Sequence, residues 1–296
     1  MNKIVLFLLS EKGYAVLQEI LTHFGAEQID FIVLGRDSRV LNDYSNEIQK
    51  LAEEHQVKCF ERTEKFELTA SYALAISWRW MIPLSENTQL ITLHDSLLPK
   101  YRGFAPLVNQ LIQGEKQLGV TAIFASEEYD RGKILGQLHT TISYPIKIEA
   151  AIQAITPLYQ QLANDLFQQL QENQSLQGTP QQEEDATYSL WRDEADYCID
   201  WKLDASTIRR TVDALGTPYL GASSEINGRK IRILEVMEEN DVEVIQRQLN
   251  YGKVIFQRDQ RPVIVCGKGL IRINEAYYDD DGTSIFPLDK FRLRFT

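Results

Sequence analysis

Short apolar runs alternate with segments of helical periodicity through the first third of the chain, and this alternation constrains the fold most strongly. Residues 3–9 and 30–34 are apolar and rich in β-branched side chains, and residues 13–24 between them carry apolar residues at helical spacing. Further strands are expected near 57–60, 72–78 and 89–93, with a weaker helix over 41–55. Strands that alternate with helices form parallel sheets, and near-continuous apolar strands indicate coverage on both faces. We therefore expect an α/β domain with a Rossmann-like, mostly parallel sheet, although no GxGxxG or Walker motif is present.

A polar stretch divides the rest of the chain. Before it, residues 119–126 and 133–142 predict two strands around the polar turn 127–132, and residues 147–173 predict one long helix. Residues 173–187 are rich in Gln, Gly and Pro, which is typical of a linker. Beyond them, short alternating runs over 229–235, 252–257, 262–266 and 269–274 favour a smaller β-rich, barrel-like (OB-like) domain. The sequence thus predicts domains 1–185 and 186–296.

Charge and cysteine usage exclude several kinds of partner. The net charge is −11 and no cluster of Lys and Arg occurs, which disfavours a nucleic-acid partner because phosphate contacts need such clusters. The first apolar run, Ile4 to Leu9, is too short for a membrane helix of about 20 residues, so no membrane partner is expected. The cysteines Cys59, Cys198 and Cys266 lack metal-ligand spacing, so we expect no metal and a reducing, cytoplasmic location.

Polar residues gather after two of the predicted strands. His94 ends the strand 89–93, where ligands bind in open α/β sheets, and Thr92 lies two residues earlier on the same face. Asp130 lies in the turn 127–132. If the two strand ends are neighbours, Asp130 meets His94, and such a pair stabilises an oxyanion or moves a proton. Taken singly, a histidine at a strand end is more often structural, and an Asp-Arg-Gly segment is more often a simple turn.

The joint pattern resembles the N10-formyltetrahydrofolate-dependent formyltransferases. The motif HxSLLPxYRG is carried by His94, Ser96, Leu97, Leu98, Pro99, Tyr101, Arg102 and Gly103, and a YDxG turn by Tyr129, Asp130 and Gly132. Gly119-Val120-Thr121 and the later segments 186–188, 199–201, 218–222 and 263–271 extend the resemblance over nearly the whole chain. It implies the formyltransferase fold and N10-formyltetrahydrofolate as co-substrate, with no metal.

The resemblance also implies catalytic roles. His94 and Asp130 match two of the three family residues that surround the transfer, and Thr92 stands where the family has Asn. A threonine hydroxyl also donates a hydrogen bond, but it is shorter than an asparagine amide. Thr92 is therefore either a working substitute or the mark of a weakened or non-catalytic homologue.

Binding residues follow from the same resemblance. The cofactor-binding set comprises Trp78, Arg79, Trp80, Met81, Ile82, Glu127, Glu128 and Tyr129, where a flat pterin ring is expected, although the aromatic loop 78–82 also suits a core. The substrate-binding set comprises Ser96, Lys100, Arg102, Gly103, Asn109 and Tyr219. Arg102 has an alternative interpretation as a brace for the loop after His94.

The motif most resembles the sugar-nucleotide N-formyltransferases, such as those acting on UDP-4-amino-4-deoxyarabinose. The implied reaction transfers a formyl group to a UDP- or dTDP-linked amino sugar for surface polysaccharide synthesis, and a homodimer is compatible with this branch. The alternatives are methionyl-tRNA formyltransferase, a formyltetrahydrofolate hydrolase, a non-catalytic binding module, and a hydrolase with a Ser96–His94–Asp130 triad.

Overall fold

The computed structural model describes residues 3–172 and 174–296. Its backbone contacts divide the chain into two compact units. The first comprises Met1–Leu107, Gln117–Ile142 and Ile152–Leu190, and the second comprises Val108–Lys116, Ser143–Ala151 and Trp191–Thr296. Two short segments from the N-terminal half thus group with the second unit, whereas the predicted division at residues 185–186 cuts the chain once. Whether 1–185 and 186–296 fold independently stays a prediction.

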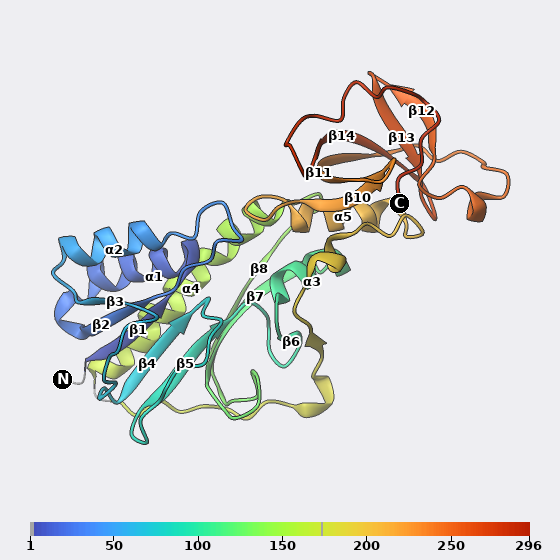
Figure 1. Ribbon diagram of the computed structural model, residues 1–296. Helices are drawn as coiled ribbons and strands as arrows, with labels where there is room; N and C mark the ends of the chain where they lie inside the picture. Colours follow the sequence, from blue (N-terminus) through green and yellow to red (C-terminus); the bar gives the residue numbers. More distant parts are fainter. Residues whose placement is uncertain (1–2, 173) are drawn as a thin grey trace. The chain divides into compact units, whose positions relative to one another are not determined.

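A seven-stranded sheet forms the centre of the first unit (Figure 1). Its strands are β1 (Ile4–Leu8), β2 (Ile29–Leu34), β3 (Cys59–Glu61), β4 (Tyr72–Ile76), β5 (Gln89–His94), β7 (Gln117–Phe124) and β8 (Ile134–Thr141), in the order β3-β2-β1-β4-β5-β7-β8. The first five strands in this order pair in parallel, while β7 is antiparallel to β5 and β8 is antiparallel to β7. The expected α/β domain with a mostly parallel sheet is confirmed.

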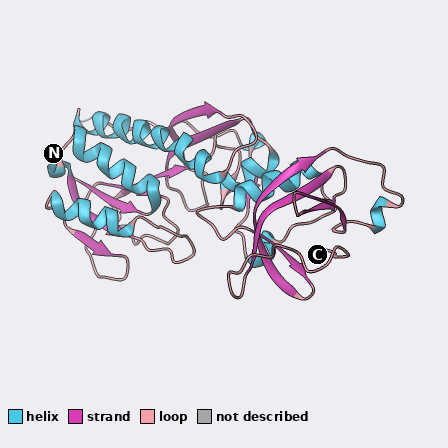
Figure 2. Ribbon diagram, turned by 90° about the horizontal axis from the view of Figure 1, so that it is seen from above, coloured by secondary structure: helices cyan, strands magenta, loops and turns pink. Residues whose placement is uncertain are grey.

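Three helices of this unit lie side by side (Figure 2). They are α1 (Ser10–His23), α2 (Ser45–Glu54) and α4 (Ile148–Gln171), which runs through Pro157 without a break. The ring of Phe24, just after α1, lies 5.5 Å from that of Phe167 in α4, and Gln160 donates a hydrogen bond to the carbonyl of Ala15. These contacts join α1 to α4 on one face of the sheet. A shorter helix, α3 (Pro106–Gln113), follows the His94 loop.

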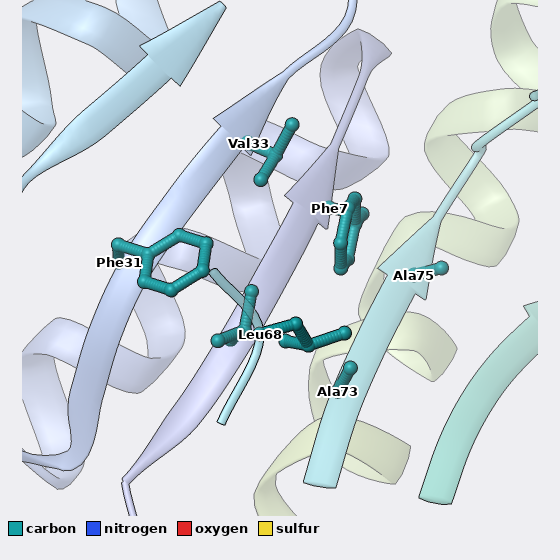
Figure 3. Packing of buried hydrophobic residues seen from close by; sticks show 7 residues of the cluster. Phe7, Phe31, Val33, Leu68, Ala73 and Ala75 are labelled. Atoms are coloured by element: carbon teal, nitrogen blue, oxygen red, sulfur yellow. The ribbon is translucent and has the colours of Figure 1, made fainter. Parts of the chain in front are cut away.

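Loops rather than helices cover the opposite face of the sheet. Figure 3 looks onto the apolar cluster there, with the helices behind the strands; the cluster comprises Val5, Phe7, Phe31, Val33, Leu68, Ala73 and Ala75. Phe66 and Trp78, from the loops before and after β4, pack onto it, each within 6 Å of the ring of Phe7. The apolar runs 3–9 and 30–34 were predicted to form strands covered on both faces, and β1 and β2 are covered in this way. Helices cover one face, and aromatic side chains from loops cover the other.

Strand register places the candidate residues on this loop-covered face. Phe7 pairs with Ala75, and Ala75 pairs with Thr92. Paired residues of neighbouring strands share a face, so Thr92 lies in the same row as Phe7, at about 10 Å for two strand spacings. His94 is two residues further along β5 and so shares this face at the carboxyl edge of the sheet.

The second unit contains a five-stranded antiparallel sheet. Its strands are β10 (Ala222–Ile226), β11 (Arg229–Glu239), β12 (Val254–Arg258), β13 (Arg261–Val265) and β14 (Leu270–Tyr278), in the order β10-β11-β14-β13-β12. Helix α5 (Ala205–Leu215) packs against β11 and buries Ile208 and Val212. The expected β-rich domain is confirmed, but the sequence analysis missed β10, because Ser223 and Ser224 are both buried and break the apolar alternation.

Short elements complete the chain. Two-residue strands β6 (Arg102–Gly103) and β9 (Tyr188–Ser189) pair in parallel within the first unit. Single 3₁₀ turns occur at η1 (Ala26–Gln28), η2 (Glu183–Asp185), η3 (Glu194–Tyr197) and η4 (Arg247–Leu249). Over residues 3–172 and 174–296, none of the helices has the length and hydropathy needed to cross a bilayer.

Candidate active site

His94 and Asp130 form the centre of the site. The His94 ring is only 8% exposed, and its Nε2 lies 2.8 Å from the carbonyl oxygen of Tyr101. Its Nδ1 lies 3.5 Å from Oδ2 of Asp130, whose side chain is 19% exposed. Because a carbonyl oxygen only accepts, the Nε2 atom of His94 carries a proton in its contact with Tyr101. The proximity expected from the two strand ends is therefore present; the catalytic roles of the two residues stay predictions.

The backbone fixes the position of Asp130. Its carboxylate accepts a 2.8 Å hydrogen bond from the amide of Gly103, and Gln181 donates through Nε2 to the carbonyls of Asp130 and Gly132 at 2.7 and 2.8 Å. Only glycine fits at position 132, since a Cβ there would lie 1.6 Å from the Phe124 carbonyl oxygen. This turn therefore holds the carboxylate with several ties instead of leaving it on a free loop.

Thr92 lies half-buried on the same face as His94. In the described part of the chain its hydroxyl makes no hydrogen bond. A donor that is not used by the protein is what an oxyanion of the reaction requires. The predicted role of Thr92 as a hydrogen-bond donor in catalysis stays a prediction.

The loop after His94 is rigid, and Ser96 serves that rigidity. The Ser96 side chain is buried and its hydroxyl donates to the Lys100 carbonyl at 2.6 Å, while Thr121 Oγ1 donates to the Ser96 carbonyl at 2.6 Å. A hydroxyl directed at a backbone carbonyl is not a nucleophile activated by His94. The geometry contradicts the Ser96–His94–Asp130 triad, and it leaves Ser96 without a free group for substrate. Lys100 is exposed and has no side-chain partner among residues 3–172 and 174–296.

Arg102 braces the loop. Its side chain is 0% exposed and donates to Gln181 at 2.7 Å, to both oxygens of Glu183 at 2.9 Å, and to the Tyr188 hydroxyl at 3.2 Å. The hydrogen bonds that the Glu183 carboxylate accepts, first from Arg102 and then from Arg131, lower the pKa of Glu183 to about 2. Every guanidinium nitrogen of Arg102 is thus bonded to the protein, which favours the bracing interpretation, and the nucleotide contact by Arg102 stays a prediction.

A cavity of about 390 Å³ adjoins Asp130. It is lined by Gly103, Phe104, Glu127, Glu128, Tyr129, Arg131, Tyr188, Ser189 and Leu190. The rings of Phe104 and Tyr129 lie 5.4 Å apart and are exposed, as is that of Tyr188. Sequence reasoning found Gly103 and residues 127–129, but it missed Tyr188 and Leu190, which it assigned to the start of the second domain. We call it the Asp130 cavity, because its lining residues Tyr129 and Arg131 flank Asp130 in the chain and its lining residue Gly103 donates to the Asp130 carboxylate.

A second cavity, of about 360 Å³, lies over Phe7 and Val33. Trp78 and Met81 from the predicted cofactor loop line it, together with Arg62 and Phe66. The other members of that loop are engaged elsewhere: Arg79 pairs with Asp37, Trp80 stacks under Arg62 at 4.7 Å, and Ile82 packs on the apolar cluster. The predicted cofactor residues thus line two separate cavities rather than one.

The remaining predicted contacts, Asn109 and Tyr219, belong to the second unit. There Asn109 accepts a 2.6 Å hydrogen bond from Arg192, and the Tyr219 amide donates to the Gly216 carbonyl at 2.9 Å. In the described ranges no three His, Cys, Asp or Glu side chains come close enough together to hold a metal ion.

Comparison with known proteins agrees with this geometry. The family model described as Formyl transferase matches residues 2–156, and that of the Formyl transferase C-terminal domain matches residues 192–281. A methionyl-tRNA formyltransferase of Syntrophomonas wolfei is 28% identical over 229 residues, which are 75% of this chain and 70% of the relative. For this relative and two further methionyl-tRNA formyltransferases, from Acetivibrio thermocellus and Treponema denticola, the match spans 57 to 70% of the relative's length.

Two solved structures share the fold. The N-formyltransferase of Helicobacter canadensis, in complex with folinic acid and dTDP-3-aminofucose, has a TM-score of 0.68 at 17% identity over 92% of this chain and 99% of that one. HypX of Aquifex aeolicus in complex with tetrahydrofolic acid has a TM-score of 0.60 at 19% identity over 94% of this chain but only 44% of its own length. The two family matches cover most of the sequence, and the chain belongs to the formyl transferase family.

Proposed function

We propose that this protein transfers the formyl group of N10-formyltetrahydrofolate to the amine of a nucleotide-linked amino sugar. The observation that carries the proposal is the His94–Asp130 pair beside a cavity walled by aromatic rings, in a chain of the formyl transferase family. The Helicobacter relative, similar over its whole length, supports the acceptor class because it was solved with a folate and a dTDP-amino sugar. A UDP- or dTDP-linked sugar of surface polysaccharides, handled in the cytoplasm by a monomer or homodimer, is the expected setting.

The folate fits the Asp130 cavity in shape and chemistry. Phe104, Tyr129 and Tyr188 present apolar ring faces, and the peptide groups of Glu127 and Glu128 offer donors and acceptors to a pterin edge. Trp78 and Met81 line the cavity in the row of Thr92, so we keep the loop 78–82 as a second candidate for ring contact. Lys100 is the exposed cation nearest in sequence to His94 and the best candidate for the diphosphate; Asn109 and Tyr219 remain proposed contacts.

The chemistry is an acyl transfer between two nitrogens. Formyltetrahydrofolate supplies an activated formyl carbon; the amine lone pair forms the new C–N bond, the bond to N10 breaks, and one proton passes from the amine to N10. Asp130, tied by Gly103 and Gln181, accepts the amine proton directly or through water. For the His94 ring to donate to the negative charge on the formyl oxygen, its Nε2 exchanges the contact with the Tyr101 carbonyl for that oxygen when substrate binds, and the Thr92 hydroxyl is the second donor. The turn and the rigid loop hold these groups in place before substrate arrives.

Incubation of the protein with N10-formyltetrahydrofolate and a panel of UDP- and dTDP-linked 3-amino and 4-amino sugars tests the proposal. We expect a sugar that gains the mass of one formyl group, and a loss of at least about 10²-fold in rate for His94→Ala. The matched control is His55→Ala, which changes an exposed histidine at the end of α2. Equal rates for the two variants, or no formylated sugar, would contradict the proposal.

Initiator methionyl-tRNA is the second candidate acceptor, because the curated sequence relatives are methionyl-tRNA formyltransferases. A net charge of −11 disfavours it, since tRNA binding depends on clustered cations. Charged initiator tRNA belongs in the same panel. Its formylation in preference to every sugar would reassign the acceptor, whereas folate cleavage without any acceptor would indicate a hydrolase.

A further inference from the structure

A buried polar cluster lies directly behind the catalytic histidine. Lys12 of α1 donates to both carboxylate oxygens of Asp95, at 2.9 and 2.6 Å, and the hydroxyl of Tyr159 of α4 donates to Oδ1 of the same carboxylate. The side chains of Lys12 and Asp95 are 11% and 16% exposed, and Tyr159 is fully buried. Asp95 is the residue after His94, so two helices far apart in sequence, α1 and α4, converge on the end of β5.

The carboxylate of this cluster is charged. Burial alone raises the pKa of a carboxyl group, but the charge of Lys12 and the hydrogen bonds of Lys12 and Tyr159 outweigh it and lower the pKa of Asp95. A buried charge pair contributes little to stability compared with apolar residues of similar size, so stability alone does not account for it. Its location next to His94 gives it another use.

We propose that Lys12 and Asp95 are positioning residues for His94, with Asp95 acting as a second carboxylate that favours the imidazolium. Lys12 keeps Asp95 ionised, and Tyr159, which also lies 3.3 Å from the Leu93 carbonyl, fixes the end of β5. His94 then has Asp130 on its reacting side and Asp95 behind it. The part of this inference that concerns turnover rests on the proposed function; the electrostatic part does not.

The sign of each charge effect follows from the arrangement. The groups in contact with the ring are Asp130 from the β7–β8 turn and the Tyr101 carbonyl. The Asp95 carboxylate, bound by Lys12 of α1 and Tyr159 of α4, interacts electrostatically with His94 from the next position in the chain. Asp95→Asn removes a negative charge and leaves the Lys12 cation, which disfavours a charged His94. Adding Lys12→Met removes that cation as well, so part of the stabilisation of a charged His94 is restored. Tyr159→Phe changes no charge.

The test is a proton and nitrogen-15 NMR titration of the histidine side chains of the full chain without substrates. We expect Asp95→Asn to lower the titration midpoint of His94 by about 0.5–1 pH unit, the size of a unit charge across a partly buried site. The double variant Lys12→Met/Asp95→Asn recovers at least half of that shift, and Tyr159→Phe leaves the midpoint unchanged. His55 is the internal reference and does not move in any variant.

Two results would overturn the proposal. One is a His94 midpoint in Asp95→Asn equal to that of the wild type; the other is a double variant that titrates like Asp95→Asn. A purely structural role would give one of these, even if turnover fell. In the double variant, neither position 12 nor position 95 carries a charge, so no unpaired charge is left buried there. This variant therefore keeps the test open if Asp95→Asn folds poorly. Because the titration needs no turnover, a failed acceptor panel leaves this inference standing, and the reverse also holds.

Discussion

Replacing Arg102 by methionine tests how the site is braced. Methionine keeps the length and apolar stem of the side chain but removes all guanidinium donors. Those donors join Gln181, Glu183 and Tyr188, and Gln181 in turn holds the carbonyls of Asp130 and Gly132. The substitution therefore frees the turn that carries Asp130 without touching Asp130 itself.

The expected decrease in the free energy of unfolding depends on which partners of Arg102 become solvated after the substitution. Glu183 is 53% exposed and Tyr188 is also exposed, so both become solvated once the arginine is gone. The lost charge-assisted hydrogen bonds contribute about 1.5–3 kcal/mol, and the half-buried Gln181 oxygen left without its donor adds about 1 kcal/mol. We expect the free energy of unfolding of Arg102→Met to fall by about 3 kcal/mol.

Urea unfolding followed by circular dichroism measures this difference. The matched control is Arg36→Met in the same unit. Arg36 is bonded as richly, to Glu61, Ser45, Asn46 and Gln49, but its side chain is 45% exposed. An exposed ion pair contributes at most about 1 kcal/mol, so the control should unfold near the wild-type midpoint. Equal losses in the two variants would refute the argument from burial.

Three further predictions concern single side chains. Because the Glu183 pKa is lowered from 4.5 to about 2, its contribution to stability is complete above about pH 5 and is lost as pH falls; the destabilisation by Glu183→Gln in thermal melts should shrink from pH 6 toward pH 3. Thr92→Val should lower kcat about 10²-fold while Thr92→Ser retains most of it, and equal rates would show that the hydroxyl is idle. Burial raises the pKa of Cys59 to about 11 and of Cys266 to about 12, so a thiol reagent should modify one cysteine rapidly, and Cys198→Ser should abolish that phase.

Much of the fold was predictable because it depends on local pattern. The apolar runs near residues 4–9 and 30–34 form β1 and β2, and the long periodic segment forms α4 over Ile148–Gln171. The direction of β7 was not predictable: it runs antiparallel to β5, although it is buried almost without interruption, as is typical of strands in parallel sheets. The two-residue strands β6 and β9 were also missed, since their pairing depends on residues far apart in the sequence.

The candidate site shows the same division. The motif around His94 and the turn around Asp130 were visible as polar residues after apolar strands. Arg102 looked like a ligand for phosphate, but its partner Glu183 lies 81 residues away and the sequence does not pair them. The Lys12–Asp95 contact spans 83 residues, and Lys12 lies just before the predicted helix 13–24, so the sequence does not pair the two residues.

The most direct test of the central claim is single-turnover formyl transfer by Asp130→Asn, with the acceptor sugar found in the panel. The amide keeps the size of the carboxylate but neither accepts the amine proton as a base nor pairs with a charged His94. We expect the rate to fall by about 10²–10⁴-fold with folate binding retained, whereas Asp165→Asn, on the exposed side of α4, stays at the wild-type rate. A wild-type rate for Asp130→Asn would contradict the assignment of the His94–Asp130 pair as the reacting centre.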